Sequence, residues 1–281
     1  MLMRRFSFAV TLLITLFPFT TFSQIKGDSW AAVQSKGSGT LAIIYSEQAG
    51  LIFKDKDGKI KGVCVDIIND FAKHIKDKHG KSITVKYVRE EPVFGTFLST
   101  VQSTPDLVGI TNTTITEERK KIFKFSPAYM SNRQVLLTHN SAPSLTSLKE
   151  LPVKFSGFSA QVIAGSTQVQ YVEKIKADHM PALRISHEQS GPAIIKNLSS
   201  NPRVFTVIDF TEFIHVVHHK LPIKRHAVDV GPVEELGFVL SRQSDWDPPL
   251  KDFLTSDYRN SSRYRQIITE NLGATFLSLV K

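Results

Sequence analysis

Two periodicities of hydrophobic and polar residues alternate along the chain. Short apolar runs bounded by polar or turn residues predict β-strands. They occupy residues 40–45, 83–88, 106–110, 134–138, 161–164, 204–208 and 236–241. Apolar residues repeating every three to four positions predict amphipathic helices. These cover residues 66–78, 94–101, 166–178, 191–198 and 248–272, with another helix after residue 209. The alternation predicts an α/β fold of two units, followed by a C-terminal return of strand and helices, with largely parallel sheets.

Turn and cap residues separate these elements. Gly58, which follows an aspartate, is typical of a hairpin turn, and Gly80 ends the helix at 66–78. Thr116 and Ser166 each precede a helix. We expect both to cap it, because a hydroxyl accepts a hydrogen bond from the free amides of a first turn.

The first 23 residues have the pattern of a secretory signal peptide. Arg4 and Arg5 precede an apolar stretch over 9–19, which is shorter than the roughly 20 residues needed to span a bilayer. Small residues follow at Thr21 and Ser23, so we expect cleavage to leave a mature chain that begins near residue 24. The sequence therefore predicts export to the periplasm by the general secretion pathway, and an uncleaved membrane anchor is the alternative.

Composition and charge exclude several classes of protein. Hydrophobic residues make up 41% of the chain and charged residues 22%, which is typical of a globular protein. The net charge of +9 is spread among acidic residues, and no basic tract with interleaved aromatics is present, so we expect no nucleic-acid partner. Cys64 is the only cysteine, so no internal disulfide is available, and its apolar neighbours predict that it is buried.

The most informative segment is a polar loop after the predicted strand at 106–110. It holds Asn112 and Thr114 and leads into a short helix that carries Arg119. Ligands of open α/β sheets bind beyond the carboxyl ends of strands, and an arginine there can bind a carboxylate through two parallel hydrogen bonds. The alternative is that Arg119 is a surface partner of Glu117 or Glu118.

This segment closely resembles the signature of the periplasmic amino-acid-binding proteins of ABC importers, family 3 of the bacterial solute-binding proteins. The matching residues are Thr114, Ile115, Thr116, Arg119, Phe125, Ser126 and Tyr129. Further matches in the same order are Gly62 to Asp66, Ala164 to Thr167, Tyr264 to Ile268, and Leu272-Gly273. The resemblance extends from about Thr40 to Gly273. It implies a two-lobed type II periplasmic binding protein, whose lobes are joined by two hinge strands. We expect residues 24–132 with 235–281 to form one lobe and 133–234 the other.

The resemblance also implies the roles of individual residues. Arg119 would hold the α-carboxylate of the ligand, with Thr114 and Asn112 assisting from the same loop. Ser166 and Thr167 would bind that carboxylate from the other lobe at a helix N-terminus.

Asp209 matches the acid that holds the α-ammonium group of the ligand. A role as helix N-cap is its alternative, and the two roles are compatible. Many family members also stack an aromatic ring on the ligand from the loop after the first strand. In this chain Gln48 or a neighbour falls at that position, and Tyr45 and Phe53 lie nearby but out of register. Tyr45 is included among the candidate ligand-binding residues.

Few residues suggest catalysis or metal binding. His215, His218 and His219 would lie on one predicted helix and could pair as metal ligands, but no cysteine or acid joins them at a suitable spacing, and solvated histidines are the alternative. The chain contains no motif of a nucleophilic, phosphate-binding or zinc-dependent enzyme. We therefore predict no cofactor, no metal and no enzymatic activity.

Three functions remain open from the sequence. The first is a monomeric binding protein that closes around an amino acid and delivers it to an ABC permease in the membrane. The second is a periplasmic dehydratase of the cyclohexadienyl type on the same fold, with Glu212, Glu173 or Glu188 as the candidate acid. The third is a sensory protein that presents its ligand to a membrane receptor.

Overall fold

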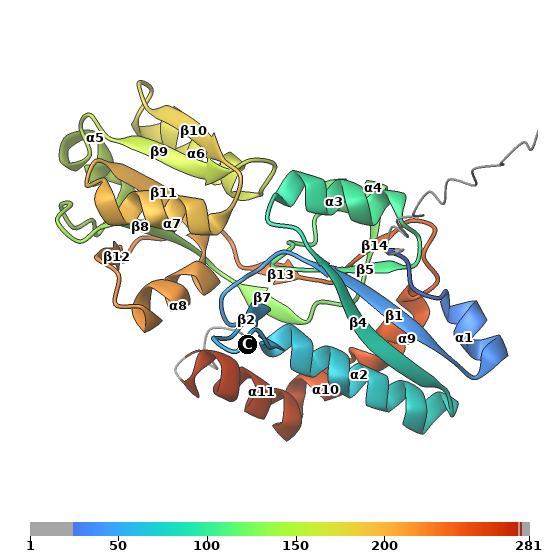
Figure 1. Ribbon diagram of the computed structural model, residues 1–281. Coiled ribbons are helices and arrows are strands. Elements are labelled where there is room, and N and C mark those ends of the chain that lie inside the picture. The colour runs from blue at the N-terminus through green and yellow to red at the C-terminus, as the bar shows by residue number, and fades with distance from the viewer. Residues whose placement is uncertain (1–24, 275, 277–281) are drawn as a thin grey trace, which may run out of the picture.

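The computed structural model describes residues 25–274 and 276, so the predicted signal peptide lies outside the described residues. The chain forms two lobes, each built on a five-stranded sheet with helices on its faces (Figure 1). The helices are α1 (Trp30–Lys36), α2 (Val63–His79), α3 (Phe94–Ser103), α4 (Glu117–Ile122), the 3₁₀ turn η1 (Leu148–Glu150), α5 (Leu151–Lys154), α6 (Gln168–His179), α7 (Gly191–Ser200), α8 (Phe210–His218), α9 (Asp247–Phe253), α10 (Ser256–Asn260) and α11 (Ser262–Leu272). The strands are β1 (Ser38–Tyr45), β2 (Phe53–Lys54), β3 (Ile60–Lys61), β4 (Ser82–Glu90), β5 (Leu107–Ile110), β6 (Phe123–Phe125), β7 (Met130–Asn132), β8 (Gln134–His139), β9 (Ser159–Ile163), β10 (Arg184–Glu188), β11 (Val204–Asp209), β12 (Ile223–Arg225), β13 (Glu234–Leu236) and β14 (Val239–Ser241).

Both sheets are mixed and follow the same plan. The first has the order β4-β1-β5-β14-β6 and the second β10-β9-β11-β8-β12. Their first three strands are parallel, as predicted, whereas β14 and β8 run antiparallel to both of their neighbours. These two strands enter their sheets directly from a linking strand. They lack the helical crossover that parallel neighbours require, and this explains why the prediction of largely parallel sheets fails at these positions.

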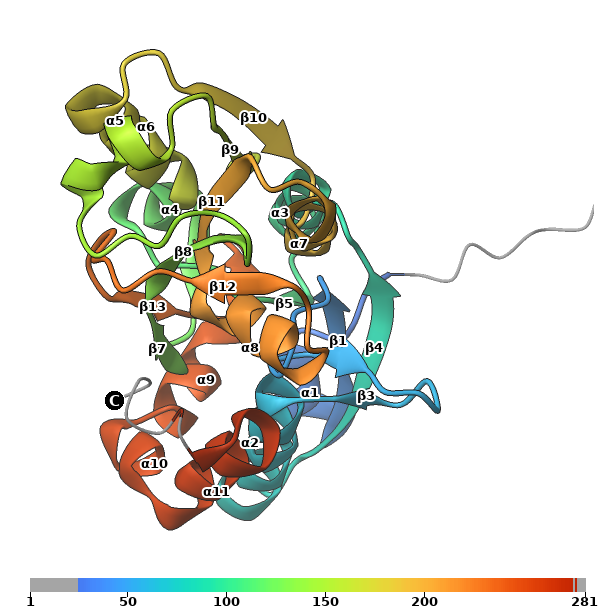
Figure 2. The same cartoon turned by 90° about the vertical axis from the view of Figure 1, so that its left-hand side faces the viewer.

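Two antiparallel strands, β7 and β13, join the lobes (Figures 1 and 2). Strand β7 continues into β8 of the second lobe, and β13 leads back into β14 of the first. The sequence predicted one strand over 236–241, but the chain divides it at Gly237. A Cβ atom at this glycine would lie 2.8 Å from the Ile115 side chain, so glycine there leaves room for this side chain of the 111–116 loop. The fold therefore matches the predicted two-lobed architecture with two connecting strands.

The core of each lobe lies on both faces of its sheet. In β1, Ile43 faces the cluster that contains the buried side of α2, and Ile44 faces the cluster that contains Phe97 and Val101 of α3. Successive side chains of a strand point to opposite faces, so a central strand covered on both sides is apolar throughout. This is why residues 40–45 form a continuous apolar run.

Helix α2 begins earlier than its predicted start at residue 66. Its first turn contains Val63, Cys64 and Val65, all buried, and Gly80 ends the helix in a left-handed conformation with φ 64°. Cys64 is fully buried, as predicted, and burial raises the pKa of its thiol to about 12. The cysteine therefore packs as a small apolar residue and stays protonated at neutral pH.

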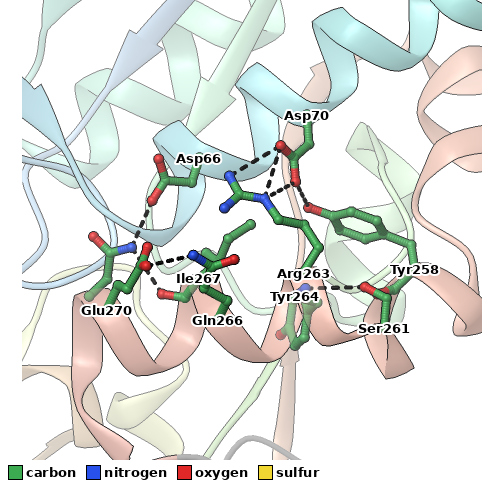
Figure 3. A network of polar contacts seen from close by, with 10 residues as sticks. Asp66, Asp70, Tyr258, Ser261, Arg263, Tyr264, Gln266, Ile267 and Glu270 are labelled. Carbon is green, nitrogen blue, oxygen red and sulfur yellow. Dashed lines mark hydrogen bonds and ion pairs between the residues drawn. The ribbon is translucent and has the colours of Figure 1, made fainter.

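The C-terminal helices return to the first lobe and pack on α2 (Figure 3). Arg263 of α11 donates from Nε and Nη2 to the Asp70 carboxylate at 3.0–3.3 Å, and the Tyr258 hydroxyl donates to the same group at 3.0 Å. Near the other end, the Asn271 amide donates to Asp66 at 2.8 Å. These contacts join residues that lie 188 to 205 positions apart in the sequence within one lobe.

Several short elements were not predicted: α1, β6, β7, β10 and β12. All five contain three to seven residues, too few to show a period. The N-cap predicted at Ser166 is wrong, because α6 begins at Gln168 and the Ser166 hydroxyl donates instead to the Ile163 carbonyl at 2.7 Å. The cap predicted at Thr116 is confirmed, since its hydroxyl accepts from the Arg119 amide at 3.1 Å.

Within the described residues, no helix has the length and apolar character required to cross a membrane.

Candidate ligand-binding site

A cavity of about 250 Å³ lies between the two lobes. Its walls come mainly from the ends of β1, β4, β5, β9, β10 and β11 and from the first turns of the following helices. The lining residues are Ser46, Glu47, Gln48, Glu90, Pro92, Phe94, Thr111, Asn112, Thr114, Arg119, Ile163, Ser166, Thr167, Gln168, Gln189, Ser190, Gly191, Pro192, Asp209 and Glu212. Parallel strands place their carboxyl ends at one edge, so polar residues from distant parts of the sequence converge here.

Arg119 contributes the positive charge of the cavity wall. Its Nη1 donates to the Thr114 carbonyl at 2.9 Å, its Nη2 donates to the Gly165 carbonyl of the other lobe at 3.1 Å, and its guanidinium lies 5.4 Å from the centre of the Phe94 ring. A guanidinium has five N–H donors, so these two bonds leave donors for a ligand. Burial lowers the pKa of Arg119, and the charges of Glu234 and Asp209 oppose the shift. The alternative role as a partner of Glu117 is not observed, because Glu117 pairs with Lys120.

Asp209 is the buried acid on the opposite lobe. The side chain at the end of β11 is 2% exposed, and its Oδ1 accepts from Asn132 at 2.6 Å, Gln134 at 2.8 Å and Gln168 at 2.9 Å. Its Oδ2 accepts from the Asn112 amide of the first lobe. Asp209 occupies the N-cap position of α8 without a side-chain cap bond. Burial raises its pKa to about 6, although the Gln134 amide acts in the opposite direction.

Glu234 binds two residues that line the cavity, Thr114 and Thr167, and it was not predicted from the sequence. Its carboxylate accepts from the hydroxyls of Thr114 at 2.7 Å, Thr167 at 3.1 Å and Tyr171 at 2.7 Å. It also accepts from the Gln134 amide at 2.9 Å. No local pattern marks Glu234, because its position depends on the pairing of β13 with β7.

Ser166 and Thr167 bring the N-terminus of α6 to the cavity. Helix α6 has 12 residues, and the partial positive charge of its first turn favours an anion. Thr167 Oγ1 lies 3.5 Å from Thr114 Oγ1 across the gap between the lobes. The chain therefore places Arg119, Thr114 and this helix end around the same part of the cavity.

Tyr45 does not line the cavity, which corrects its inclusion among the candidate residues. Its side chain is 2% exposed, packs edge to face with Tyr87 at 6.1 Å, and donates from its hydroxyl to Glu90 at 3.2 Å. The physical reason is that Tyr45 ends β1 on the face that packs against α2. The following residues, Ser46 to Gln48, reach the cavity instead.

A second buried carboxyl, Glu212, lies one helical turn beyond Asp209. It is 3% exposed, and burial raises its pKa to about 7 while the nearby Gln48 amide opposes the shift. Of the three acids considered for catalysis, Glu212 alone belongs to the cavity lining among the described residues. Glu188 instead accepts from the Gln161 amide at 3.1 Å, and Glu173 is exposed on α6.

The histidines of α8 do not lie in this cavity. The His215 and His219 rings are 4.1 Å apart, and burial lowers the pKa of His215. Within residues 25–274 and 276, the group of potential metal ligands that the fold gathers is His74, His79 and Asp252, whose donor atoms lie within 4.8 Å of one another.

Lys78 already neutralises Asp252 in that group, with 2.5 Å between its ammonium and the carboxylate. No local pattern marks this cluster, because Asp252 lies more than 170 positions from the histidines. We interpret the cluster as an ion-pair network at the end of α2.

The chain has two lobes joined by two strands, and the cavity between the lobes carries groups of opposite charge. This combination is typical of two-lobed solute-binding proteins. The model of the bacterial extracellular solute-binding proteins, family 3, matches residues 41–273, and the chain belongs to this family. No curated protein sequence matches the chain significantly.

Solved structures share the fold. The chain is 24% identical to an ancestral arginine-binding protein bound to glutamine, with a TM-score of 0.66 over 83% of this chain and 98% of that chain. An ABC uptake transporter substrate-binding protein from Streptococcus pneumoniae with bound histidine has 18% identity and a TM-score of 0.68, covering 87% and 96%. The ancestral amino-acid-binding protein AncCDT-1, a precursor of cyclohexadienyl dehydratase, has 19% identity and a TM-score of 0.67, covering 86% and 98%. At these identities the likeness shows the fold.

Proposed function

We propose that the protein captures an amino acid outside the cytoplasm by closing its lobes and delivers it to an ABC importer. The observation that carries the proposal is the placement of a half-buried arginine and a buried aspartate in one cavity, on opposite lobes. A free amino acid presents an α-carboxylate and an α-ammonium group, which require partners of these two charges.

The binding roles follow from the geometry of the two groups. Arg119 offers its remaining N–H donors to the α-carboxylate, and Thr114 and the first turn of α6 complete that site. Asp209 accepts from the α-ammonium group. A cation beside Asp209 lowers the pKa of this carboxyl group below its value of about 6 in the protein alone, so binding favours the ionised carboxylate.

Closure involves contacts that bridge the lobes. Asn112 donates to Asp209, and Arg119 donates to Gly165 at 3.1 Å, so binding residues of one lobe touch the other lobe. We assign residues 24–132 with 235–281 to one lobe and 133–234 to the other, with β7 and β13 as the hinge. A ligand held from both sides favours the closed population, because its contacts with the second lobe exist only there.

A thermal-shift assay tests the proposal. The mature protein is refolded to remove any retained ligand and is then heated with each of the common amino acids. A ligand at 100 times its Kd adds about 2.7 kcal/mol to the free energy of unfolding, which raises the Tm by several degrees.

We expect an amino acid to raise the Tm of the wild type and of Arg184→Ala, an exposed arginine of the second lobe, but not of Arg119→Ala. The proposal fails if no amino acid raises the Tm, or if Arg119→Ala responds like the wild type. Uptake of the bound amino acid by cells with and without the gene then distinguishes delivery to an importer from sensing.

One observation supports a second candidate function, a dehydratase. Glu212 is buried in the cavity, and burial raises its pKa to about 7, which suits an acid that gives a proton to a departing hydroxyl group. Incubation of the protein with prephenate or arogenate tests this candidate. Formation of the aromatic product that is lost in Glu212→Gln would support it, and the absence of turnover would reject it.

A further inference from the structure

We propose that Gln48 and Glu212 form a subsite for a positively charged ligand side chain, and that Glu212 releases its proton when this side chain binds. The inference rests on the proposed function and names the class of amino acid that it concerns. The two residues belong to different lobes: Gln48 follows β1, and Glu212 lies in the first turn of α8. Both line the cavity, and their side chains are 4% and 3% exposed.

The subsite contains a buried polar group without a protein partner. Gln48 Nε2 makes no hydrogen bond to any described residue, and its amide lies close enough to the Glu212 carboxyl group to lower the pKa of that group. The backbone of Gln48 is fixed, because its amide donates to the Ile52 carbonyl at 2.8 Å and its carbonyl accepts from the Leu51 amide at 3.1 Å. Buried polar groups are normally paired, so this pair of side chains at the wall of a cavity indicates a ligand partner.

The carboxyl group of Glu212 occupies the space that Gly191 leaves by having no side chain. A Cβ atom at Gly191 would lie 1.9 Å from Glu212 Oε1, so glycine at this position gives the carboxyl group its place. Gly191 is the first residue of α7, a helix of 10 residues, and the positive end of that helix favours the ionised form of Glu212.

The charges of the cavity favour a cation over an anion. Among the lining residues that the structure describes, the acids are Glu47, Glu90, Asp209 and Glu212, and the base is Arg119. Lys54 already pairs with Glu90 at 2.5 Å. If the ligand's α-carboxylate pairs with Arg119 and its α-ammonium with Asp209, Glu212 still lacks a cation.

The groups that act on Glu212 set the direction of its titration. Asp209 on the same helix raises the pKa of Glu212, and Gln48 from the loop after β1 lowers it. Glu47 of that loop is exposed, His215 lies one turn further along α8, and Gly191 of α7 has no titratable side chain. Burial is the largest cause of the rise to about 7.

A guanidinium or ammonium group beside Glu212 reverses this balance, since an opposite charge favours the carboxylate. The proton leaves the Glu212 carboxyl group for the solvent. The ligand cation then forms an ion pair with the carboxylate. The amide of Gln48 then donates to the same carboxylate, which satisfies its free N–H group.

Isothermal titration calorimetry tests the inference with L-arginine, L-lysine and the neutral L-glutamine. Titrations near pH 6.5 in two buffers of different ionisation enthalpy count the protons released. We expect the wild type to bind arginine or lysine at least 10-fold more tightly than glutamine and to release part of a proton for each bound cation. We expect Glu212→Gln to weaken the binding of the cationic amino acid by about 10- to 100-fold, which is the strength of a hydrogen bond to a charged group. Its proton release should fall to the smaller part that Asp209 contributes.

The control is Glu173→Gln, an exposed glutamate of the same lobe outside the cavity lining, which should bind and release protons like the wild type. Tightest binding of a neutral or anionic amino acid, or an unchanged proton count in Glu212→Gln, overturns this inference and leaves the proposed function intact. Failure of every amino acid to bind overturns both.

Discussion

Burial sets the protonation of the two carboxyl groups that face the cavity. The pKa of Asp209 is about 6 and that of Glu212 about 7, both above the ordinary values of these side chains. The folded protein therefore binds these protons more tightly than the unfolded chain does. The free energy of unfolding falls as the pH rises from about 4 through the folded-state pKa values, and it levels off above them.

Glu212→Gln should remove part of this dependence in the ligand-free protein. At pH 4 the variant and the wild type should unfold nearly alike, because Glu212 is protonated in the folded state and largely protonated in the unfolded chain. At pH 8 the variant should be more stable by an amount on the order of 2 kcal/mol, since no buried carboxylate has to form. Urea unfolding between pH 4 and pH 8 measures the difference, with Glu173→Gln as the control. A difference that is constant with pH would contradict the assignment of the raised pKa to Glu212.

Gly191→Ala tests the packing of the Glu212 carboxyl group. The added methyl group would overlap Glu212 Oε1, and we expect a loss of about 1–3 kcal/mol in the free energy of unfolding. Gly95→Ala on α3 is the matched control, because a Cβ atom there meets nothing within 4 Å and alanine favours the helix. The loss should shrink when Glu212→Ala is added, and equal losses in both backgrounds would show that the contact is not responsible.

At the scale of elements, the packing of α11 on α2 completes the first lobe. Asp70 receives hydrogen bonds from Arg263 and Tyr258, as Figure 3 shows, and the Asp70 side chain is only 20% exposed. The bidentate geometry and the tyrosine hydroxyl make this contact stronger than an ordinary surface ion pair.

Asp70→Asn should lower the free energy of unfolding by about 1 kcal/mol, because the charge is lost and the asparagine keeps a single acceptor oxygen. Asp77→Asn, an exposed aspartate of the same helix, should change it little. Denaturant unfolding of both variants measures the difference. Comparable effects of the two substitutions would mean that helix propensity, rather than the contact between α2 and α11, determines the result.

At the scale of the whole molecule, β7 and β13 connect the lobes, and we expect the lobes to move about these two strands. Among the described residues, polar hydrogen bonds such as Asn112–Asp209 and Arg119–Gly165 bridge the lobes, and water can replace such bonds, so we expect the ligand-free protein to open. Small-angle X-ray scattering should show a smaller radius of gyration after addition of a bound amino acid, and Arg119→Ala should show no decrease. An unchanged radius in the wild type, at a ligand concentration that raises its Tm, would contradict hinge closure.

The sequence predicted most elements because their information is local. The apolar run at 40–45, the cap at Thr116 and Gly80 at the end of α2 each act within a few residues. Where elements are short, as in β7 and β12, no period exists to be recognised. The directions of β8 and β14 also escaped prediction, because strand direction depends on the connection between the lobes.

The residues of the candidate site also fall into those that local sequence predicts and those that only the fold brings together. Arg119, Thr114, Asn112 and Asp209 could be named from one motif and one strand end, and the fold brings all four to the cavity. Glu234 could not, since its neighbours come from strand pairing.

The sequence by itself determined an α/β chain with its loops at the carboxyl ends of strands and with the motif of its family, since helix and strand periods and caps are properties of neighbouring residues. Tertiary structure decided that Tyr45 is a core residue and that Glu234 supports the cavity. It also decided that Gln48 and Glu212, which come from different lobes, lie buried at its wall. Burial and hydrogen bonding between distant segments determine charge and pKa, and these exist only once the two lobes are assembled.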